Sequence, residues 1–296
     1  MQLSVWPSLS QPFSDIVATA RHTEETGWDR LYLADHFMTN NAARAGIGEC
    51  FTTLAALSAL VPRLRLGSLV AGNTYRHPAV LANMAATIDH ISDGRFVLGV
   101  GAGWQQNEHE AYGIELPLPR PRLQRFEEAC AVLRSLFSES RTTFEGEYYQ
   151  LVDAPLEPRP IQDPIPLLIG GAGEKVMLNI VARYADEWNC WGTPETLRHK
   201  IEVLSAHCAA VGRDPATIHK SAQVLWIIEG ENDDATSAPA TQPTLRGSPE
   251  ALAEALGEYA AAGVDEVIVP DWNFGPITSR LWIYDRIFNE AAAELH

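Results

Sequence analysis

Short apolar runs alternate with longer amphipathic segments along most of the chain, and the stretch from Asn83 to Trp104 shows this pattern most completely. Apolar residues recur at helical spacing over Met84–Ile91, Asp93–Gly94 indicates a turn, and Phe96–Val100 is a nearly all-apolar run. A short strand that is apolar on both faces is typical of a parallel sheet covered by helices. We therefore expect one unit of a parallel α/β protein here.

The same alternation continues to the end of the sequence. Eight runs are expected to be strands: Leu3–Trp6, Arg30–Ala34, Leu64–Ala71, Phe96–Val100, Pro166–Ile169, Glu187–Cys190, Ile218–Glu229 and Glu266–Val269. Helical segments separate these runs, so the sequence predicts an α/β protein with a (β/α)8 TIM barrel and insertions at the C-terminal face. A doubly wound open sheet is the alternative. We expect residues 1–296 to form a single domain, with an elaboration at about 105–165.

Four segments are predicted in addition to the barrel units. Leu123–Phe137 has the pattern of an amphipathic helix, and Thr142–Val152 that of a hairpin around Glu145–Gly146. Residues 231–247 are acidic and rich in Pro, Ser and Thr, which is typical of a mobile loop. Thr278–Leu295 is expected to be the last helix.

Composition and charge exclude several classes of protein. A net charge of −16 disfavours a nucleic-acid partner, which would need a basic face. No apolar run reaches the roughly 18 residues of a membrane span, and the N-terminus lacks a basic segment leading into an apolar one. We therefore expect a cytoplasmic protein with no membrane partner. The four cysteines show no C-x-x-C spacing, which predicts neither a disulfide framework nor a thiolate metal site.

A TIM barrel carries its chemistry on the loops that follow the C-terminal ends of its strands. This rule selects five segments: Asp35–His36, Gly72–Arg76, Gly101–Trp104, Gly170–Gly173 and Asp271–Phe274. His36 directly follows a strand, where its imidazole can exchange a proton near neutral pH. A purely structural histidine fits the pattern equally well. Asp35 is interpreted as a residue that orients or caps the loop.

Two glycine-rich segments lie at these strand ends. Gly99, Gly101 and Gly103 match a dinucleotide fingerprint poorly, because the third glycine is misplaced and no acid follows about 20 residues later. Close packing of a strand against a ring, or a structural turn, explains them better. Gly170–Gly173 precedes a predicted helix, whose free N–H groups and dipole suit a phosphate, with Lys175 assisting. A tight connection without a ligand is the alternative.

Other residue types indicate or exclude particular kinds of pocket. Four aromatic residues are candidates to wall a cavity for a flat ring, although core packing explains each one singly: Tyr75, Trp104, Trp226 and Trp272. No H-x-H pair stands at a strand end, so no metal-dependent hydrolase is expected. Schiff-base chemistry is excluded because Lys175 and Lys200 fall in predicted helices and Lys220 opens a strand on the wrong face.

Several segments in this order resemble the bacterial luciferase-like monooxygenase superfamily of flavin- and deazaflavin-dependent barrel enzymes, and most closely its coenzyme F420-dependent oxidoreductase branch. They read GWDRLYLADHF, LGSLVAGNTYRHPAVLANMAATIDHISDGRFVLGVGAGWQQNEHEAYGI, PLLIGGAGEK, YADEWN and AGVDEVIV. The long central match is highly specific, and the similarity runs nearly from end to end.

The resemblance implies a cofactor that lies across the C-terminal face of the barrel. His36 then contacts the reactive ring region and acts in proton transfer, and a bulge near Leu69–Val70, often with a non-prolyl cis peptide, backs the ring. Gly170–Gly173 correspond to the glycine segment that binds the cofactor phosphate in this superfamily. The resemblance and the strand-end positions together give these candidate cofactor-binding residues: Asp35, Leu69, Val70, Ala71, Gly72, Asn73, Gly101, Gly103, Trp104, Gly170, Gly171, Ala172 and Gly173.

One departure from the family pattern bears on the substrate. In the sugar-phosphate dehydrogenases of this superfamily the position of Trp104 carries a glutamate that donates a proton, so that substrate class is not expected here. Glu108, one turn further on, either substitutes for that glutamate or faces solvent. A polyanionic cofactor tail would depend on a few basic residues: Arg76, His77, Lys175 or Arg183.

Three functional hypotheses follow. The first is an F420-dependent oxidoreductase that transfers a hydride between the deazaflavin and a small organic substrate. The second is an FMN-dependent monooxygenase that uses reduced flavin and oxygen, with a separate cofactor-reducing enzyme as partner. The third is a non-catalytic flavin-binding protein. The resemblance also implies a homodimer. The loops 38–49 and 231–247 and the elaboration at about 105–165 are expected to shape the substrate pocket, but their composition names no ligand.

Overall fold

The strands form a closed parallel barrel. The computed structural model describes residues 1–41, 43–232 and 242–291. The barrel strands are β1 (Gln2–Trp6), β2 (Arg30–Leu33), β3 (Arg65–Ser68), β4 (Ala71–Gly72), β5 (Phe96–Gly101), β8 (Leu167–Gly170), β9 (Glu187–Trp191), β10 (His219–Gln223) and β13 (Glu266–Pro270). Their order is β3-β2-β1-β13-β10-β9-β8-β5-β4, and β3 also pairs with β5, which closes the sheet. Since β3 and β4 share one position beside β5, the predicted eight-stranded TIM barrel is confirmed.

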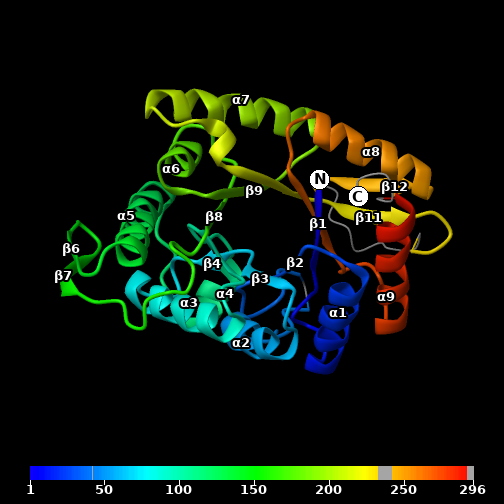
Figure 1. Ribbon diagram of the computed structural model, residues 1–296, viewed down its shortest axis with the longest axis horizontal. Coiled ribbons are helices and arrows are strands. Elements are labelled where there is room, and N and C mark those ends of the chain that lie inside the picture. Colours follow the sequence, from blue (N-terminus) through cyan, green and yellow to red (C-terminus); the bar gives the residue numbers. More distant parts are fainter. Residues whose placement is uncertain (42, 233–241, 292–296) are drawn as a thin grey trace.

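Helices surround this barrel, as Figure 1 shows. They are α1 (Phe13–Thr26), α2 (Cys50–Leu60), α3 (Pro78–Ser92), α6 (Met177–Tyr184), α7 (Pro194–Ala210), α8 (Pro249–Ala261) and α9 (Ile277–Arg286). Local sequence sets their ends. Helix α1 stops at Gly27, whose φ of 97° suits a residue without a Cβ, and its N–H donates to the Thr23 carbonyl. Helix α3 begins with Pro78, which supplies no N–H where none is needed.

The predicted elaboration lies between β5 and β8. It consists of α4 (Gln106–Tyr112), α5 (Pro119–Ser138) and the antiparallel strands β6 (Thr142–Glu145) and β7 (Gln150–Ala154). The hairpin and the amphipathic helix are therefore confirmed. Figure 1 shows the β6–β7 hairpin at the left-hand edge of the molecule, beyond α5 and away from the barrel strands.

Two predicted strands are divided in the structure. The third strand is not continuous from Leu64 to Ala71, because a cis peptide between Leu69 and Val70 separates β3 from β4. The predicted strand Ile218–Glu229 is also wrong as a single strand. β10 ends at Gln223, and β11 (Leu225–Ile228) leaves the barrel.

The partner of β11 lies in the segment that was predicted to be a mobile loop. β12 (Thr244–Gly247) pairs with β11 in parallel, so the loop prediction is wrong for these four residues. Residues 233–241 of that segment lie outside the described residues. Helix α9 continues as a π-helical turn, Ile287–Ala291, and the remainder of the predicted last helix also lies outside them.

The N-terminal end of the barrel interior is filled by charged side chains. The Arg30 guanidinium lies 2.6 Å from Glu187 and 3.7 Å from Glu266, and His219 Nε2 lies 2.9 Å from Glu266. Ser4 also donates to Glu266. Burial raises the pKa of Glu187. Burial alone would also raise the pKa of Glu266, but Arg30 and His219 bring it below its ordinary value.

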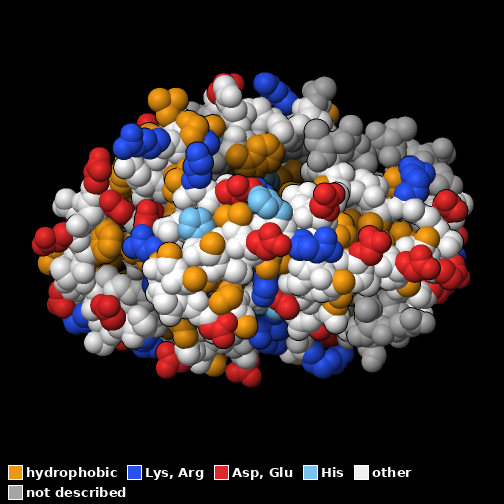
Figure 2. All heavy atoms as spheres, turned by 90° about the horizontal axis from the view of Figure 1, so that it is seen from above, with side chains coloured by type: hydrophobic (Ala, Val, Ile, Leu, Met, Phe, Trp, Pro, Cys, Tyr) orange, Lys and Arg blue, Asp and Glu red, His pale blue; other side chains and the backbone are white. Residues whose placement is uncertain are grey.

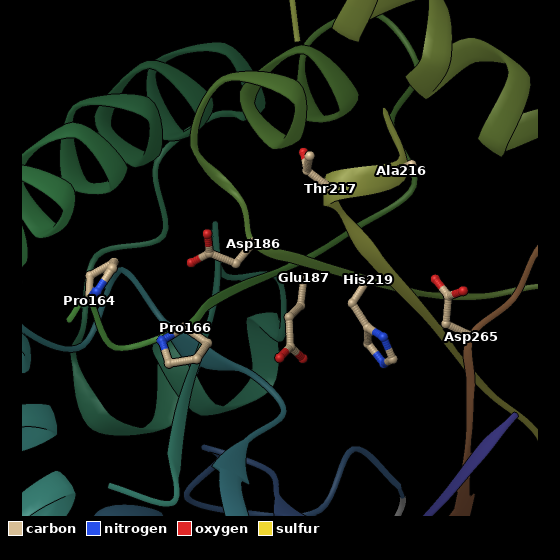
Figure 3. A pocket seen from close by; sticks show the side chains of 8 residues that line it. All are labelled: Pro164, Pro166, Asp186, Glu187, Ala216, Thr217, His219 and Asp265. Atoms are coloured by element: carbon tan, nitrogen blue, oxygen red, sulfur yellow. The ribbon is translucent and has the colours of Figure 1, made fainter. Parts of the chain in front are cut away.

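A cavity of about 400 Å3 opens beside these charged groups. Figure 3 shows the side chains that line it, with Glu187 and His219 pointing the same way. Glu187, His219 and Glu266 are spaced closely enough to hold a cation, but Arg30 already supplies positive charge to both carboxylates. This end of a TIM barrel serves stability, whereas chemistry belongs to the opposite face. The cavity is therefore not our candidate active site.

The surface and the helices bear on possible partners. On the face shown in Figure 2, basic side chains are interspersed with acidic ones and form no continuous basic patch. Within the described residues, no helix combines the length and the apolar character that crossing a bilayer requires.

Replacing Arg30 by Met should destabilise the protein strongly, because two buried carboxylates would then lack their cation. We expect a loss of about 3–5 kcal/mol in the free energy of unfolding, measured by urea denaturation. The control is Arg63→Met, since Arg63 pairs with Glu24 at the surface and should cost less than about 1 kcal/mol. Equal losses in the two variants would contradict this account of the barrel interior.

Candidate active site

A histidine and a glutamate meet at the C-terminal mouth of the barrel. His36 follows β2, and Glu108 belongs to α4, which follows β5. His36 Nδ1 lies 2.7 Å from Glu108 Oε1, and the Phe37 N–H donates to Glu108 Oε2 at 2.8 Å. The Tyr75 hydroxyl donates to Oε1 as well. The Glu108 carboxylate is fully buried, whereas the His36 side chain bonded to it is 24% exposed.

The charge on Glu108 decides the tautomer of His36. Burial alone would raise the pKa of Glu108, but the hydrogen bonds from His36 and Tyr75 lower it below its ordinary value. An ionised carboxylate only accepts hydrogen bonds, so Nδ1 of His36 carries the proton. Nε2 is then the atom that can accept or donate a proton at the mouth, where the side chain is 24% exposed.

The sequence left open whether Glu108 faces solvent or takes the place of the proton-donating glutamate of the sugar-phosphate dehydrogenases. Glu108 is buried, so the first alternative is wrong. Helix α4 is turned inward because Gln105 Nε2 donates to the Met38 carbonyl at 2.8 Å and Asn107 Nδ2 to the Thr39 carbonyl at 3.1 Å. These contacts bind α4 to the start of the loop 38–49.

Asp35 orients the loop after β4. Its buried carboxylate accepts from the Gly72 N–H at 3.0 Å and pairs with both terminal nitrogens of Arg76, at 2.5 and 2.9 Å. Arg76 also lies 3.3 Å from Glu49, so its charge is shared between two carboxylates. The loop-orienting interpretation of Asp35 is confirmed by these contacts, whereas its direct contact with a cofactor stays a prediction.

The predicted bulge is present, and the Val70 side chain explains two glycines near it. The peptide bond between Leu69 and Val70 is cis. A Cβ atom at Gly101 or Gly170 would lie only 2.8 or 3.0 Å from the side chain of Val70, whereas a Cβ atom at Gly99 would lie 2.0 Å from the Ser68 carbonyl oxygen. Gly101 and Gly170 therefore make room for Val70, and Gly99 makes room for the backbone of β3, rather than for a ring directly. Among the predicted residues of this segment, Leu69, Ala71, Gly72 and Asn73 are buried, and Val70 is partly exposed at the mouth.

Gly103 and Trp104 form the edge of the mouth beside His36. Gly103 has a φ of 88°, and a Cβ there would lie 2.8 Å from Thr74 Oγ1. Thr74 Oγ1 is itself 2.8 Å from His109 Nε2, so this position has no room for a side chain. Trp104 follows, 59% exposed, with its ring edge-on to His36 at a centroid distance of 5.7 Å.

The predicted phosphate segment is placed differently from the expectation. Helix α6 begins at Met177, so a turn separates it from Gly173, and Lys175 lies in that turn and not in the helix. The Gly171 N–H donates to the Asn189 carbonyl at 2.9 Å and is not available to a ligand. Ala172, Gly173 and Lys175 line a cavity of about 390 Å3, which keeps the phosphate prediction open.

The other basic residues that the sequence offered for a polyanionic cofactor tail already have partners within the protein. Arg183 forms an ion pair with Glu127, and His77 caps α3 and packs edge-on against Tyr149. Within the part of the chain that the structure describes, Lys175 has no ion pair and is exposed. It is therefore the strongest of the predicted cations.

The aromatic residues at the mouth are only partly those that the sequence predicted to wall a cavity. Trp226 lies in β11 and is fully buried, so it lines no open pocket, and Tyr75 belongs to the network around Glu108. Trp272 is joined instead by Trp6 and Trp191, which the sequence analysis did not single out. Both are the last residues of their strands, a position that could have identified them.

The fold and these contacts define a parallel (β/α)8 barrel with a histidine–carboxylate pair and a cis-peptide bulge at its C-terminal mouth. Comparison with known proteins identifies the family. A family model described as luciferase-like monooxygenase matches residues 1–242, and the chain belongs to this family.

Relatives of two kinds are similar to the chain. F420-dependent glucose-6-phosphate dehydrogenase of Kineococcus radiotolerans is 36% identical over 172 residues, covering 58% of this chain and 50% of the relative. Pyrimidine monooxygenase RutA of Methylobacterium radiotolerans is 36% identical over 221 residues, covering 72% and 56%. The chain thus spans about half the length of these curated relatives. Both are enzymes, which agrees with the expected enzyme class, but they differ in reaction.

A solved structure extends the similarity in fold to the whole chain. F420-dependent secondary alcohol dehydrogenase in complex with an F420–acetone adduct has a TM-score of 0.87 and covers 98% of both chains. Its sequence identity is 20%, so this likeness concerns the fold.

Replacing Glu108 by Gln should lower turnover while leaving the fold intact. The amide removes the negative charge, and it offers one acceptor oxygen where three donors meet, so His36 loses its fixed orientation. We expect about a 10- to 100-fold loss in kcat and a stability loss of about 1–3 kcal/mol. Steady-state kinetics and urea denaturation measure the two effects. The control is Glu110→Gln, an exposed residue of the same helix. Unchanged kcat in Glu108→Gln would remove this residue from the site.

Proposed function

We propose that the protein is an F420-dependent oxidoreductase that transfers a hydride between the deazaflavin and a small organic substrate. The observation that carries the proposal is the His36–Glu108 pair beside the Val70 bulge at the barrel mouth. The similarity to F420-dependent glucose-6-phosphate dehydrogenase supports this choice of cofactor. The proposal includes one domain and a location in the cytoplasm, which the sequence pattern and composition predict, and a homodimer, which the resemblance implies.

The residues at the mouth suit a flat cofactor with a phosphate-bearing tail. Trp104 offers an exposed apolar ring beside His36, and Val70 offers a partly exposed apolar side chain at the mouth. The cavity lined by Ala172, Gly173 and Lys175 provides a free cation and small residues for the phosphate. When bound, the deazaflavin supplies the carbon that donates or accepts the hydride.

The chain itself supplies the proton transfer. Hydride addition to a polar double bond of the substrate leaves negative charge on its more electronegative atom, and that atom needs a proton. His36 in its doubly protonated, positively charged form provides the proton from Nε2, and the Glu108 carboxylate stabilises this charged form; the neutral imidazole that remains keeps its proton on Nδ1. In the reverse direction Nε2 accepts the proton. The buried position of Glu108 keeps its charge unscreened by water.

The second candidate is an FMN-dependent monooxygenase that uses reduced flavin and oxygen, with a separate reductase. The similarity to pyrimidine monooxygenase RutA over 72% of the chain favours it. A parallel titration of the apoprotein with F420 and FMN separates the two candidates. We expect micromolar or tighter binding of F420 and weaker binding of FMN. The reverse order would support the monooxygenase, and binding of neither would overturn both proposals.

Replacing His36 by Ala should abolish most of the catalysis without abolishing cofactor binding. We expect turnover to fall by about 10²–10⁴-fold, because the proton donor is lost, with the F420 dissociation constant changed little. His22→Ala is the control, since His22 pairs with Asp285 away from the mouth. Equal turnover in His36→Ala and the unchanged protein would favour a non-catalytic cofactor-binding protein instead.

Replacing Lys175 by Met should weaken cofactor binding. An exposed cation contributes modestly, so we expect about a three- to tenfold rise in the F420 dissociation constant at low salt, and a smaller rise at high salt. Lys220→Met is the matched control, because Lys220 pairs with Asp265 at the other end of the barrel. Identical dissociation constants in all three proteins would place the phosphate elsewhere.

A further inference from the structure

Three tryptophans form one side of the barrel mouth. Trp6 ends β1, Trp191 ends β9, and Trp272 follows β13. The Trp6 ring centroid lies 4.8 Å from that of Trp272 and 6.0 Å from that of Trp191, and the remaining pair is 5.8 Å apart. Because β13 and β10 lie between β1 and β9 in the barrel wall, Trp6 and Trp191 meet only by projecting into the interior.

The tryptophan cluster belongs to the same interior layer as the bulge. Trp6 packs in one apolar cluster with Leu69, and Val70 and Trp191 pack against that cluster. Trp6 and Trp191 therefore belong to the same layer as the bulge residues Leu69 and Val70, beside which the proposed cofactor binds. Trp272 is 38% exposed and Trp191 is partly exposed, whereas Trp6 is 7% exposed and forms the base.

The loop that carries Trp272 is held on both sides. Buried Asp271 accepts from the Ser8 N–H at 2.9 Å and from Gln11 Nε2 at 2.6 Å, which ties it to the loop after Trp6. Asn273 Nδ2 donates to the Trp226 carbonyl at 2.7 Å. A wall that is ordered before binding loses little conformational entropy when a ligand arrives.

An unsatisfied polar group stands beside this wall. Gln223 ends β10 and is in register with Trp191 on one side and Ile268 on the other. Ser221, two residues earlier on the same face, bonds to Asn189 inside the barrel, so Gln223 also points inward. Gln223 is 6% exposed, and within the described residues its Oε1 has no hydrogen-bond partner. A buried acceptor without a partner costs free energy, which a ligand donor would recover.

The wall offers no charge to a substrate. Its members are three tryptophans and one amide. The nearby cation Arg280 is engaged by Gln11 and lies 3.6 Å from Asp271. An anionic sugar phosphate would therefore meet aromatic faces and an amide where it needs a cation.

We propose that Trp6, Trp191 and Trp272 with Gln223 form the substrate subsite, and that the substrate is a planar, uncharged, mainly apolar molecule with one hydrogen-bond donor. This inference rests on the proposed function for the presence of a cofactor above Val70. The rings supply flat contact area, and an aromatic ring stacked against them gains affinity beyond that of its buried area alone. Gln223 selects for the donor.

The test uses two probes, 2-naphthol and 2-methoxynaphthalene, in which a methyl group replaces the hydrogen of the hydroxyl donor. Their binding to the full chain loaded with F420 is measured by titration calorimetry, with glucose 6-phosphate as the anionic comparison. We expect 2-naphthol to bind more tightly than either of the others. Trp272→Ala should weaken both naphthalenes about tenfold. Trp282→Ala, an exposed tryptophan of the outer helix α9, is the matched control and should change nothing.

The amide is tested separately by Gln223→Leu, which keeps the size and removes the acceptor. Its affinity for 2-naphthol should fall about five- to tenfold, while that for 2-methoxynaphthalene stays the same. If Trp272→Ala fails to fold, this probe pair still decides the assignment. Undiminished binding in both variants, or tighter binding of glucose 6-phosphate, would overturn the inference.

The failure of this inference is distinguishable from failure of the proposed function. If F420 binds and His36→Ala loses turnover, but neither Trp272→Ala nor Gln223→Leu changes the affinity for the naphthalenes, only the assignment of the substrate subsite is wrong. If neither F420 nor FMN binds, the oxidoreductase proposal falls, and the inference that depends on it falls with it.

Discussion

The buried carboxylate of Glu108 is the interaction on which the arrangement of the barrel mouth depends. It accepts hydrogen bonds from the imidazole of His36, from the backbone of Phe37 and from the hydroxyl of Tyr75. These donors belong to the loops after β2 and β4, while the acceptor belongs to the loop after β5. One charge therefore joins three loops that the barrel strands alone would leave independent. Hydrogen bonds to an ionised group are about twice as strong as neutral ones, which suits this task.

A second constraint divides the mouth into two halves. On the side of β5 and β8, Gly101 and Gly170 leave the space that Val70 fills. On the side of β1 and β9, the same interior layer ends in large rings. Small residues on one half and tryptophans on the other make the mouth asymmetric, with Val70 on one side and an aromatic wall on the other. The two halves suit two different ligands, a cofactor and a substrate.

The sequence predicted the barrel and part of the site, for physical reasons that particular residues illustrate. Strands buried on both faces leave a strong local pattern, and a residue such as His36 is placed at the mouth by its strand end alone. The burial of Glu108 was not predictable in that way, because it depends on contacts of α4 with a loop some 70 residues earlier. Trp6 and Trp191 come together only when the sheet closes. The division of the predicted strand at 218–229 depends on pairing with β12, far along the chain.

The distribution of charge inside the barrel bears directly on the substrate. At the N-terminal end of the barrel interior, Arg30 balances Glu187 and Glu266. At the C-terminal end, Arg76 is bound by Asp35 and Arg280 lies beside Asp271, so neither cation is offered to the mouth. F420-dependent glucose-6-phosphate dehydrogenase of Kineococcus radiotolerans is 36% identical to the chain over 172 residues, but a shared barrel does not determine the substrate, because the loops after the strands bind it. The substrate of such a relative therefore does not transfer to this protein with the fold.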